Sequence, residues 1–122
     1  MRTRAEAMAF GLAFPSAVAD APFRDPNWTV IRMRESRRIF LWVFERHGQI
    51  WINVKCRPEW GAVWRSAYAS VLPAYHMNKE HWISIILNGT IPESEIQRLI
   101  AESYALVGGE GENNRQRSCA HT

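Results

Sequence analysis

The chain has 122 residues, of which 47% are hydrophobic, so its length and composition suit one compact domain with an ordinary core. It contains no run of about 18 apolar residues, which excludes a membrane-spanning helix from the sequence prediction. The net charge of +3 is uneven, because residues 1–65 hold eleven Lys or Arg and six Asp or Glu, whereas residues 66–122 hold four and six. Such asymmetry is typical of an anion-binding face, although the arginines could also serve only to keep an edge strand soluble.

The first predicted element is an amphipathic helix over residues 3–13. Thr3 and Glu6 have the spacing of a capping box, and Pro15 would end the helix. A basic start followed by apolar residues is also a feature of signal peptides. Because Glu6 interrupts the apolar patch, we expect a helix of the folded domain instead.

Three strand-like segments follow a turn-rich segment over residues 14–27. Residues 28–34 alternate Thr29, Ile31 and Met33 with Trp28, Val30, Arg32 and Arg34, and residues 50–56 alternate more cleanly, with Ile50, Ile52, Val54 and Cys56 on one side. Residues 38–45 are nearly continuously apolar, as expected of a central strand. His47-Gly48 predicts a tight hairpin turn between the last two strands.

Two further strands and two helices are predicted in the second half of the chain. Pro58 opens the first of these helices, and its core-facing stripe would contain Trp60, Val63, Trp64, Ala67 and Val71. The chain is expected to be extended after Pro73 and to form a strand over residues 81–89. The last helix would begin at Pro92 and end at Gly108-Gly109.

Together these elements predict the order α-β-β-β-α-β-β-α. Connections of hairpin length imply an antiparallel sheet, and amphipathic helices would pack on one face of it, which gives a two-layer α+β fold. Residues 1–107 would form the single domain. Residues 108–122 have no hydrophobic pattern and are predicted to be a disordered polar tail.

Several segments together resemble the MmcQ/YjbR-like family of small bacterial proteins. The resemblance covers about residues 5–107, and the "YHMNK-x-HW" core at residues 75–82 is its most specific part. The matching segments are "FPSAVADAPF" (14–23, more loosely), "NVKC" with Pro58-Glu59, "PAYHMNKEHWISIILNGTIP" (73–92) and "LIAESYALV" (99–107). One departure is Arg37-Arg38, where the family usually has a Gly-Lys pair.

The resemblance implies a two-layer α+β domain similar to secretion-chaperone-like domains. It also implies a sheet similar to the "double wing" DNA-binding domain of a phage transcription factor, which suggests DNA as a partner by analogy of fold alone. The family brings no established enzyme activity to this chain.

A candidate binding surface follows from the strand pattern. If Ile50, Ile52 and Val54 point toward the helices, the opposite face carries Trp51, Asn53, Lys55 and Trp82. Cations beside aromatic rings suit phosphate contact and base stacking, so Trp51 and Trp82 could stack, with Asn53 on the same face. The alternative is that long side chains only cover an open sheet. The candidate phosphate contacts are Arg32, Arg34, Arg37, Arg38, Lys55 and Lys79.

The loop over residues 75–82 is the densest polar segment of the chain. Asn78 suits a turn because asparagine tolerates a positive φ, and Tyr75 and Trp82 would anchor the two ends by packing. The loop is expected to be a structural turn that also displays His76, Lys79 and His81 to a partner.

Metal binding and catalysis are the weaker predictions. His76 and His81 are five positions apart, near the spacing of zinc ligands, but no CxxC pair accompanies them. Cys56 could pair with a histidine, yet it lies on the apolar side of its strand. Cys56 and Cys119 are far apart in the sequence, which argues against a structural disulfide and favours the cytoplasm. We therefore predict no metal, no cofactor and no catalytic residue.

The leading hypothesis from the sequence is a small cytoplasmic, non-enzymatic protein that binds DNA through the basic and aromatic sheet face. The alternative is a protein-interaction or small-ligand module that uses the 75–82 loop. Neither hypothesis involves a membrane, and a monomer or weak homodimer is expected.

Overall fold

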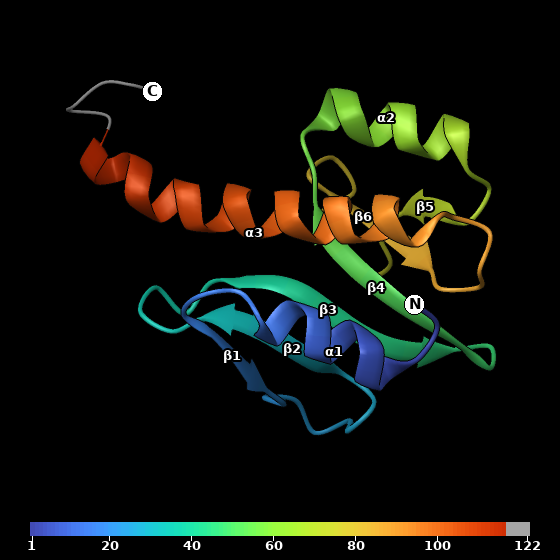
Figure 1. The fold of residues 1–122 in the computed structure, drawn as a ribbon, viewed down its shortest axis with the longest axis horizontal. Helices are drawn as coiled ribbons and strands as arrows, with labels where there is room; N and C mark the ends of the chain where they lie inside the picture. The colour runs from blue at the N-terminus through green and yellow to red at the C-terminus, as the bar shows by residue number, and fades with distance from the viewer. Residues whose placement is uncertain (117–122) are drawn as a thin grey trace.

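The structure is a computed structural model that describes the backbone of residues 1–116 and the side chains of residues 1–108. The described chain forms three helices and six strands (Figure 1). Their bounds are α1 (Arg4–Leu12), β1 (Ala17–Asp20), β2 (Thr29–Met33), β3 (Ile39–Arg46), β4 (Gln49–Lys55), α2 (Pro58–Ala67), β5 (Val71–Pro73), β6 (Trp82–Ile86) and α3 (Glu93–Gln116).

The six strands form one open antiparallel sheet in the order β1-β2-β3-β4-β6-β5. The expected α+β class, with helices against an antiparallel sheet, is confirmed. The element order contains one strand more than predicted, because Ala17–Asp20 pairs with β2 as the edge strand β1. Four residues between Pro15 and Pro22 are too short to show an alternating pattern, so the sequence indicated only a turn-rich segment.

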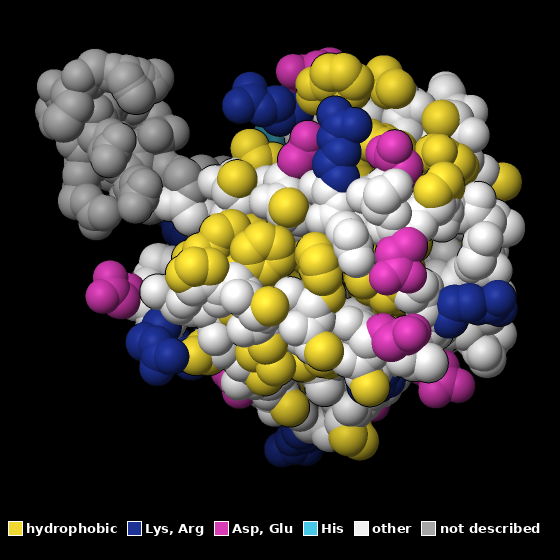
Figure 2. All heavy atoms as spheres, in the orientation of Figure 1, with side chains coloured by type: hydrophobic (Ala, Val, Ile, Leu, Met, Phe, Trp, Pro, Cys, Tyr) yellow, Lys and Arg dark blue, Asp and Glu magenta, His cyan; other side chains and the backbone are white. Residues whose placement is uncertain are grey.

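The helices pack on the face that carries Leu41, Val43, Ile52, Val54, Ile83 and Ile85, all of them buried. Helix α1 begins with the predicted capping box, and the backbone N–H groups of Arg2 and Thr3 hold the pKa of the Glu6 carboxyl below its usual value. Helix α1 lies so close to the sheet that a Cβ atom on Gly11 would come 2.5 Å from Ile31 Cδ1. Hydrophobic side chains gather between α1 and α3 (Figure 2), where the rings of Phe14 and Tyr104 stack at 4.5 Å.

Ser103 fastens α3 to the two central strands. Its hydroxyl donates to the backbone oxygen of Phe40 at 2.6 Å and accepts from the backbone N–H of Lys55 at 2.8 Å. Phe40 is the residue skipped by the register shift between β2 and β3, since Ile31 pairs with Leu41 and Arg32 with Ile39. The buried hydroxyl thus satisfies backbone groups at an irregular point of the sheet.

Helix α2 presents a different face from the one expected. Trp60 and Val63 are each 52% exposed and Ala67 is exposed as well, so the predicted core-facing stripe is wrong at these three positions. Val71, the last residue of the predicted stripe, is buried but lies on β5. The buried residue of the helix is Gly61, where an added Cβ atom would lie 3.4 Å from Ile83 Cγ2. A small residue allows the helix to approach the sheet closely, which a search for large apolar residues does not reveal.

Helix α3 continues through Gly108 and Gly109 to Gln116, so the predicted helix end is wrong. A glycine inside a helix costs only about 1 kcal/mol relative to alanine, and it stops a helix only where a left-handed cap forms. The domain boundary at 107 stays a prediction. The predicted disordered tail, residues 108–122, falls partly on this helix, and residues 117–122 lie outside the described residues. None of the described helices is long and apolar enough to cross a membrane.

Candidate functional site

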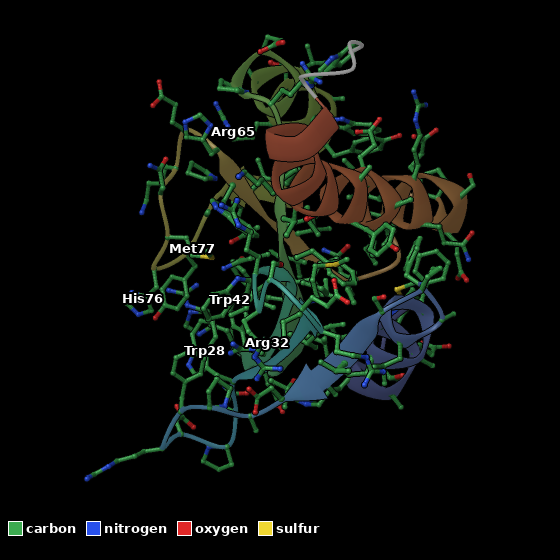
Figure 3. The ribbon with its side chains drawn as sticks, turned by 90° about the vertical axis from the view of Figure 1, so that its left-hand side faces the viewer. Trp28, Arg32, Trp42, Arg65, His76 and Met77 are labelled. Atoms are coloured by element: carbon green, nitrogen blue, oxygen red, sulfur yellow. The ribbon has the colours of Figure 1, made fainter. Side chains whose placement is uncertain are left out.

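The sheet face turned away from α1 and α3, here called the outer face, carries the residues of the candidate site. Cross-strand pairing places Trp42 opposite Asn53 and Phe44 opposite Trp51, while Ser84 lies opposite Asn53 on the next strand. Figure 3 shows His76 and Met77 on this side as well, near Trp28 and Trp42 and away from α1 and α3. The loop after β5 therefore crosses the outer face.

A buried hydrogen-bond network holds that loop on the sheet. The Ser84 hydroxyl donates to Asn53 Oδ1 at 2.5 Å and accepts from the backbone N–H of Tyr75 at 2.8 Å. Asn53 Nδ2 donates to the backbone oxygen of Tyr75 at 3.1 Å. Because Asn53 and Ser84 have no exposed surface, their role is to anchor the loop, and Asn53 does not present its amide on the outside.

An aromatic cluster continues from this anchor across the outer face. The ring of Trp28 stacks on Phe44 with centroids 4.2 Å apart, and Tyr75 lies 4.0 Å from the ring of His76. The guanidinium of Arg46 lies over Tyr75 at 4.2 Å and over Trp51 at 5.0 Å. Trp51, which the sequence predicts as a stacking residue, is only 5% exposed under this cover.

The 75–82 loop turns at a different residue from the one expected. His76 has the positive φ, 63°, that the sequence analysis assigns to Asn78. Asn78 stabilises the turn through its side chain, whose Oδ1 accepts from the backbone N–H groups of Glu80 at 2.8 Å and His81 at 3.2 Å. A positive φ at a non-glycine residue is strained, and such residues concentrate at binding and catalytic sites.

An open pocket of about 300 Å³ lies between this loop and the segment before β2. Two of its aromatic rings, Trp28 and Trp42, meet at an interplanar angle of 84°, while Phe23 stacks on Trp42 at 5.5 Å. Two flat walls thus stand nearly at right angles, and the outermost ring, Phe23, is 42% exposed. The residues of this pocket, here called the aromatic pocket, are Phe23, Trp28, Trp42, His76 and Met77.

The basic residues of the outer face are partly neutralised. Arg32 Nε lies 3.3 Å and Arg37 Nη2 lies 3.6 Å from the same carboxylate oxygen of Asp20 on β1. Arg32 also donates to the backbone oxygen of Arg37 at 3.2 Å, and its side chain is only 14% exposed. Arg34, Arg37 and Arg38 are exposed in the turn between β2 and β3.

Comparison with known proteins places the chain in a family. A family model described as YjbR matches residues 12–106, which is most of the chain. The chain belongs to the YjbR family. Among its relatives, YyaQ of Bacillus subtilis is 52% identical over 62 residues, which are 50% of this chain and 52% of YyaQ. YjbR of Escherichia coli K12 is 30% identical over 78 residues, 64% of this chain and 66% of that protein.

Solved structures share the fold. A Deinococcus radiodurans protein, DR2400, superposes with a TM-score of 0.84 at 29% identity, covering 91% of this chain and 82% of its own. A Pseudomonas syringae protein gives a TM-score of 0.76 at 27% identity, covering 86% and 98%. YyaQ and YjbR are both described as uncharacterised, and the match spans about half the length of YyaQ, so they bring no function to this YjbR-family domain.

The YjbR fold brings some of the predicted site residues together. Leu41 pairs with Val54, and Cys56 donates its backbone N–H to the oxygen of His81 at 2.8 Å. The β2–β3 turn with its arginines, Lys55 and the end of the 75–82 loop therefore lie toward the same end of the sheet. Trp82, half-buried, pairs with Lys55 at this end.

The aromatic pocket contains residues that the sequence analysis did not select. Phe23 lies in a proline-rich segment without a pattern, and Trp42 lies in a strand whose continuous apolar run conceals the alternation. Met77 lies in the 75–82 loop but carries no polar group that would indicate a binding residue. The one available signal was the number of tryptophans, six in 122 residues, which indicated aromatic surfaces without locating them.

The geometry gives little support to a metal site or a cysteine nucleophile. The described residues contain no group of three or more His, Cys, Asp or Glu side chains that could hold a metal ion. Burial, followed by the charge of Glu102, raises the pKa of the Cys56 thiol to about 11. A thiol of this kind is almost entirely protonated at neutral pH and is a poor nucleophile.

Cys56 is accordingly expected to react slowly with iodoacetamide in the folded protein at pH 8. An ordinary thiol has a pKa of about 8.5, so the raised value lowers the thiolate fraction by roughly two orders of magnitude, and burial restricts access further. Peptide mass spectrometry can follow alkylation at Cys56 with and without urea. Equal rates in the folded and unfolded chain would contradict both the burial and the raised pKa.

Proposed function

We propose that this YjbR-family domain is a non-enzymatic binding protein whose ligand is a small molecule with a planar apolar group. The observation that carries the proposal is the aromatic pocket, in which the rings of Trp28 and Trp42 meet nearly at right angles beside Phe23. Its volume of about 300 Å³ is at the lower end of the range for small-molecule sites, which are mostly apolar and concave. A planar ring can lie on one wall and meet the other edge-on, the two favoured aromatic geometries.

The support beneath the pocket fits a pre-formed site. Trp28 stacks on Phe44, and the Asn53–Ser84 network fixes the backbone of Tyr75 directly before His76. Walls that are already fixed lose little conformational entropy when a ligand binds. The loop turns His76 and Met77 into a concave surface, which favours a small ligand over a protein partner for the 75–82 loop.

The proposal is tested by titrating the protein with planar aromatic compounds, such as indole and naphthalene derivatives, while recording the indole N–H signals of the tryptophans by NMR. Binding is expected to shift the signals of Trp28 and Trp42. Phe23→Ala removes the exposed wall and should weaken binding by about tenfold, the value of one lost aromatic contact.

Trp60→Ala is the matched control, because Trp60 is also a largely exposed ring but lies on α2 outside the aromatic pocket. It should leave the affinity unchanged. Titrations in which no compound shifts Trp28 or Trp42, or in which both variants weaken binding equally, would refute the proposal.

DNA binding is a second candidate, supported by the position of the β2–β3 turn, Lys55 and the end of the 75–82 loop toward the same end of the sheet. Arg34, Arg37, Arg38, Lys55 and Lys79 would contact phosphates there. Anisotropy of labelled DNA across a salt series separates this candidate from the first. Log affinity should fall linearly with log salt, and binding that vanishes near 150 mM salt would make DNA incidental.

A further inference from the structure

Two buried hydrogen-bond donors, one in the aromatic pocket and one near it, have no hydrogen-bond acceptor among the described residues. Trp42 lines the pocket, and its indole N–H is buried without an acceptor among the described residues. Arg32 Nε is also buried without a hydrogen bond, because its 3.3 Å approach to Asp20 is an ion pair without hydrogen-bond geometry. Leaving a buried donor without an acceptor costs free energy, so a ligand that brings an acceptor to these two donors gains binding energy.

The two donors, Trp42 Nε1 and Arg32 Nε, lie on the same face of adjacent strands. Val30 pairs with Trp42 across the strands, and Arg32 follows two residues later on the same face of β2. Figure 3 shows Arg32 on the same side of the sheet as Trp42, Trp28, His76 and Met77. A ligand that lies on the ring of Trp42 can therefore extend a substituent toward Arg32.

The charge balance at this point favours an anion. Asp20 is the carboxylate shared by Arg32 and Arg37, so the cluster holds two positive charges for one negative charge. An aromatic cage can also attract an ammonium group by cation–π interaction, but two neighbouring arginines oppose a cation here. A neutral ligand would fit the walls and leave the excess charge uncompensated.

We propose that the occupant of the aromatic pocket is a planar aromatic acid, whose ring packs on Trp42 and Trp28 and whose anionic group accepts from Arg32 and from the indole N–H of Trp42. This inference rests on the proposed function, since it names the ligand class of the same pocket. Because Trp42 Nε1 and Arg32 Nε have no accessible surface in this structure, a small rotation of the two side chains must accompany binding. The indole N–H and the guanidinium then both gain an acceptor, and Asp20 competes with the ligand for Arg32.

Three compounds of matched shape test the ligand class: 2-naphthoate, the neutral 2-naphthamide and the cationic 2-naphthylmethylammonium. Each is titrated into the full chain at pH 7 and followed through the tryptophan indole signals. The carboxylate is expected to bind about tenfold more tightly than the amide, because hydrogen bonds to a charged group are roughly twice as strong, and the ammonium is expected to bind most weakly.

Two variants and one control variant test the role of Arg32. Arg32→Gln should reduce the ratio of carboxylate to amide affinity toward one, whereas Arg34→Gln, a matched loss of an exposed arginine just beyond the same strand, should keep it. Asp20→Asn removes the competing carboxylate and should strengthen 2-naphthoate binding several-fold while leaving 2-naphthamide unchanged. The Asp20 variant decides the question even if Arg32→Gln does not fold.

The outcomes separate the two proposals. Equal binding of all three compounds would overturn the aromatic acid and leave the pocket as a site for planar ligands. Failure of all three to shift Trp28 or Trp42 would overturn both. Unchanged affinity of the Asp20→Asn variant for 2-naphthoate would show that Arg32 does not bind the anionic group, and it would overturn the proposed aromatic acid.

Discussion

Replacing Asn53 with alanine is expected to lower the free energy of unfolding by about 3 kcal/mol, the cost of buried donors and acceptors left without partners and of a small cavity. Asn53 has no exposed surface and bonds to the Ser84 hydroxyl and to the backbone oxygen of Tyr75. In the variant, the oxygen of Tyr75 loses its donor and the Ser84 hydroxyl loses its acceptor. Urea unfolding followed by tryptophan fluorescence measures the change.

A second measurement reports on the loop itself. The backbone N–H of Tyr75 donates to Ser84, so its hydrogen exchange should become much faster in Asn53→Ala than in the native chain. Gln49→Ala is the matched control, because Gln49 lies at the exposed start of the same strand, and it should change stability by less than about 0.5 kcal/mol. A loss below about 1 kcal/mol in Asn53→Ala, or unchanged exchange at Tyr75, would show that the network does not hold the loop.

The sequence correctly predicted the sheet face on which Asn53 lies, but it did not predict that Asn53 is buried. The alternation of residues 50–56 correctly placed Trp51, Asn53 and Lys55 on one face and Ile52 and Val54 on the other. Alternation assigns a side chain to a face but does not reveal what covers that face. The 75–82 loop covers this face through Tyr75, which is more than twenty residues from Asn53 along the chain. Trp51 and Asn53, two of the predicted ligand residues, are therefore buried.

The missed strand β1 had a larger consequence for the site. Asp20 lies on it and pairs with Arg32 and Arg37, two of the predicted phosphate contacts. Local sequence cannot show this pairing, because it depends on Ala17–Asp20 lying antiparallel to β2. The cation count of the first 65 residues therefore overstated the charge available on the outer face.

The pocket wall before β2 depends on Arg4, and Arg4→Ala is expected to cost about 2–3 kcal/mol, the range for bonds to a charged group in a partly buried site. Arg4 Nη1 donates to the backbone oxygens of Asn27 at 2.8 Å and Val43 at 3.1 Å, and Nη2 donates to Asn27 Oδ1 at 2.9 Å. Asn27 in turn bonds through its side chain to both backbone groups of Glu45 on β3. One guanidinium thus ties α1, the segment before β2 and β3 together, directly beside Trp28.

The position of Arg4 predicts a loss of binding as well as of stability. Without the guanidinium, Asn27 keeps its bonds to Glu45 on β3 and to Asp25 but loses its link to α1. The adjacent Trp28 should therefore become more mobile, which would weaken the binding of any ligand in the aromatic pocket. Thermal unfolding and the NMR titration measure the two effects in the same variant. Arg98→Ala is the control, since the Arg98 side chain is 64% exposed and its ion pairs with Glu95 and Glu102 are long, 3.9 Å each. Ion pairs of such a surface arginine contribute at most about 1 kcal/mol. Equal losses of stability in the two variants would mean that the bonds of Arg4 count no more than a surface ion pair, and the pocket wall would then depend on aromatic packing alone.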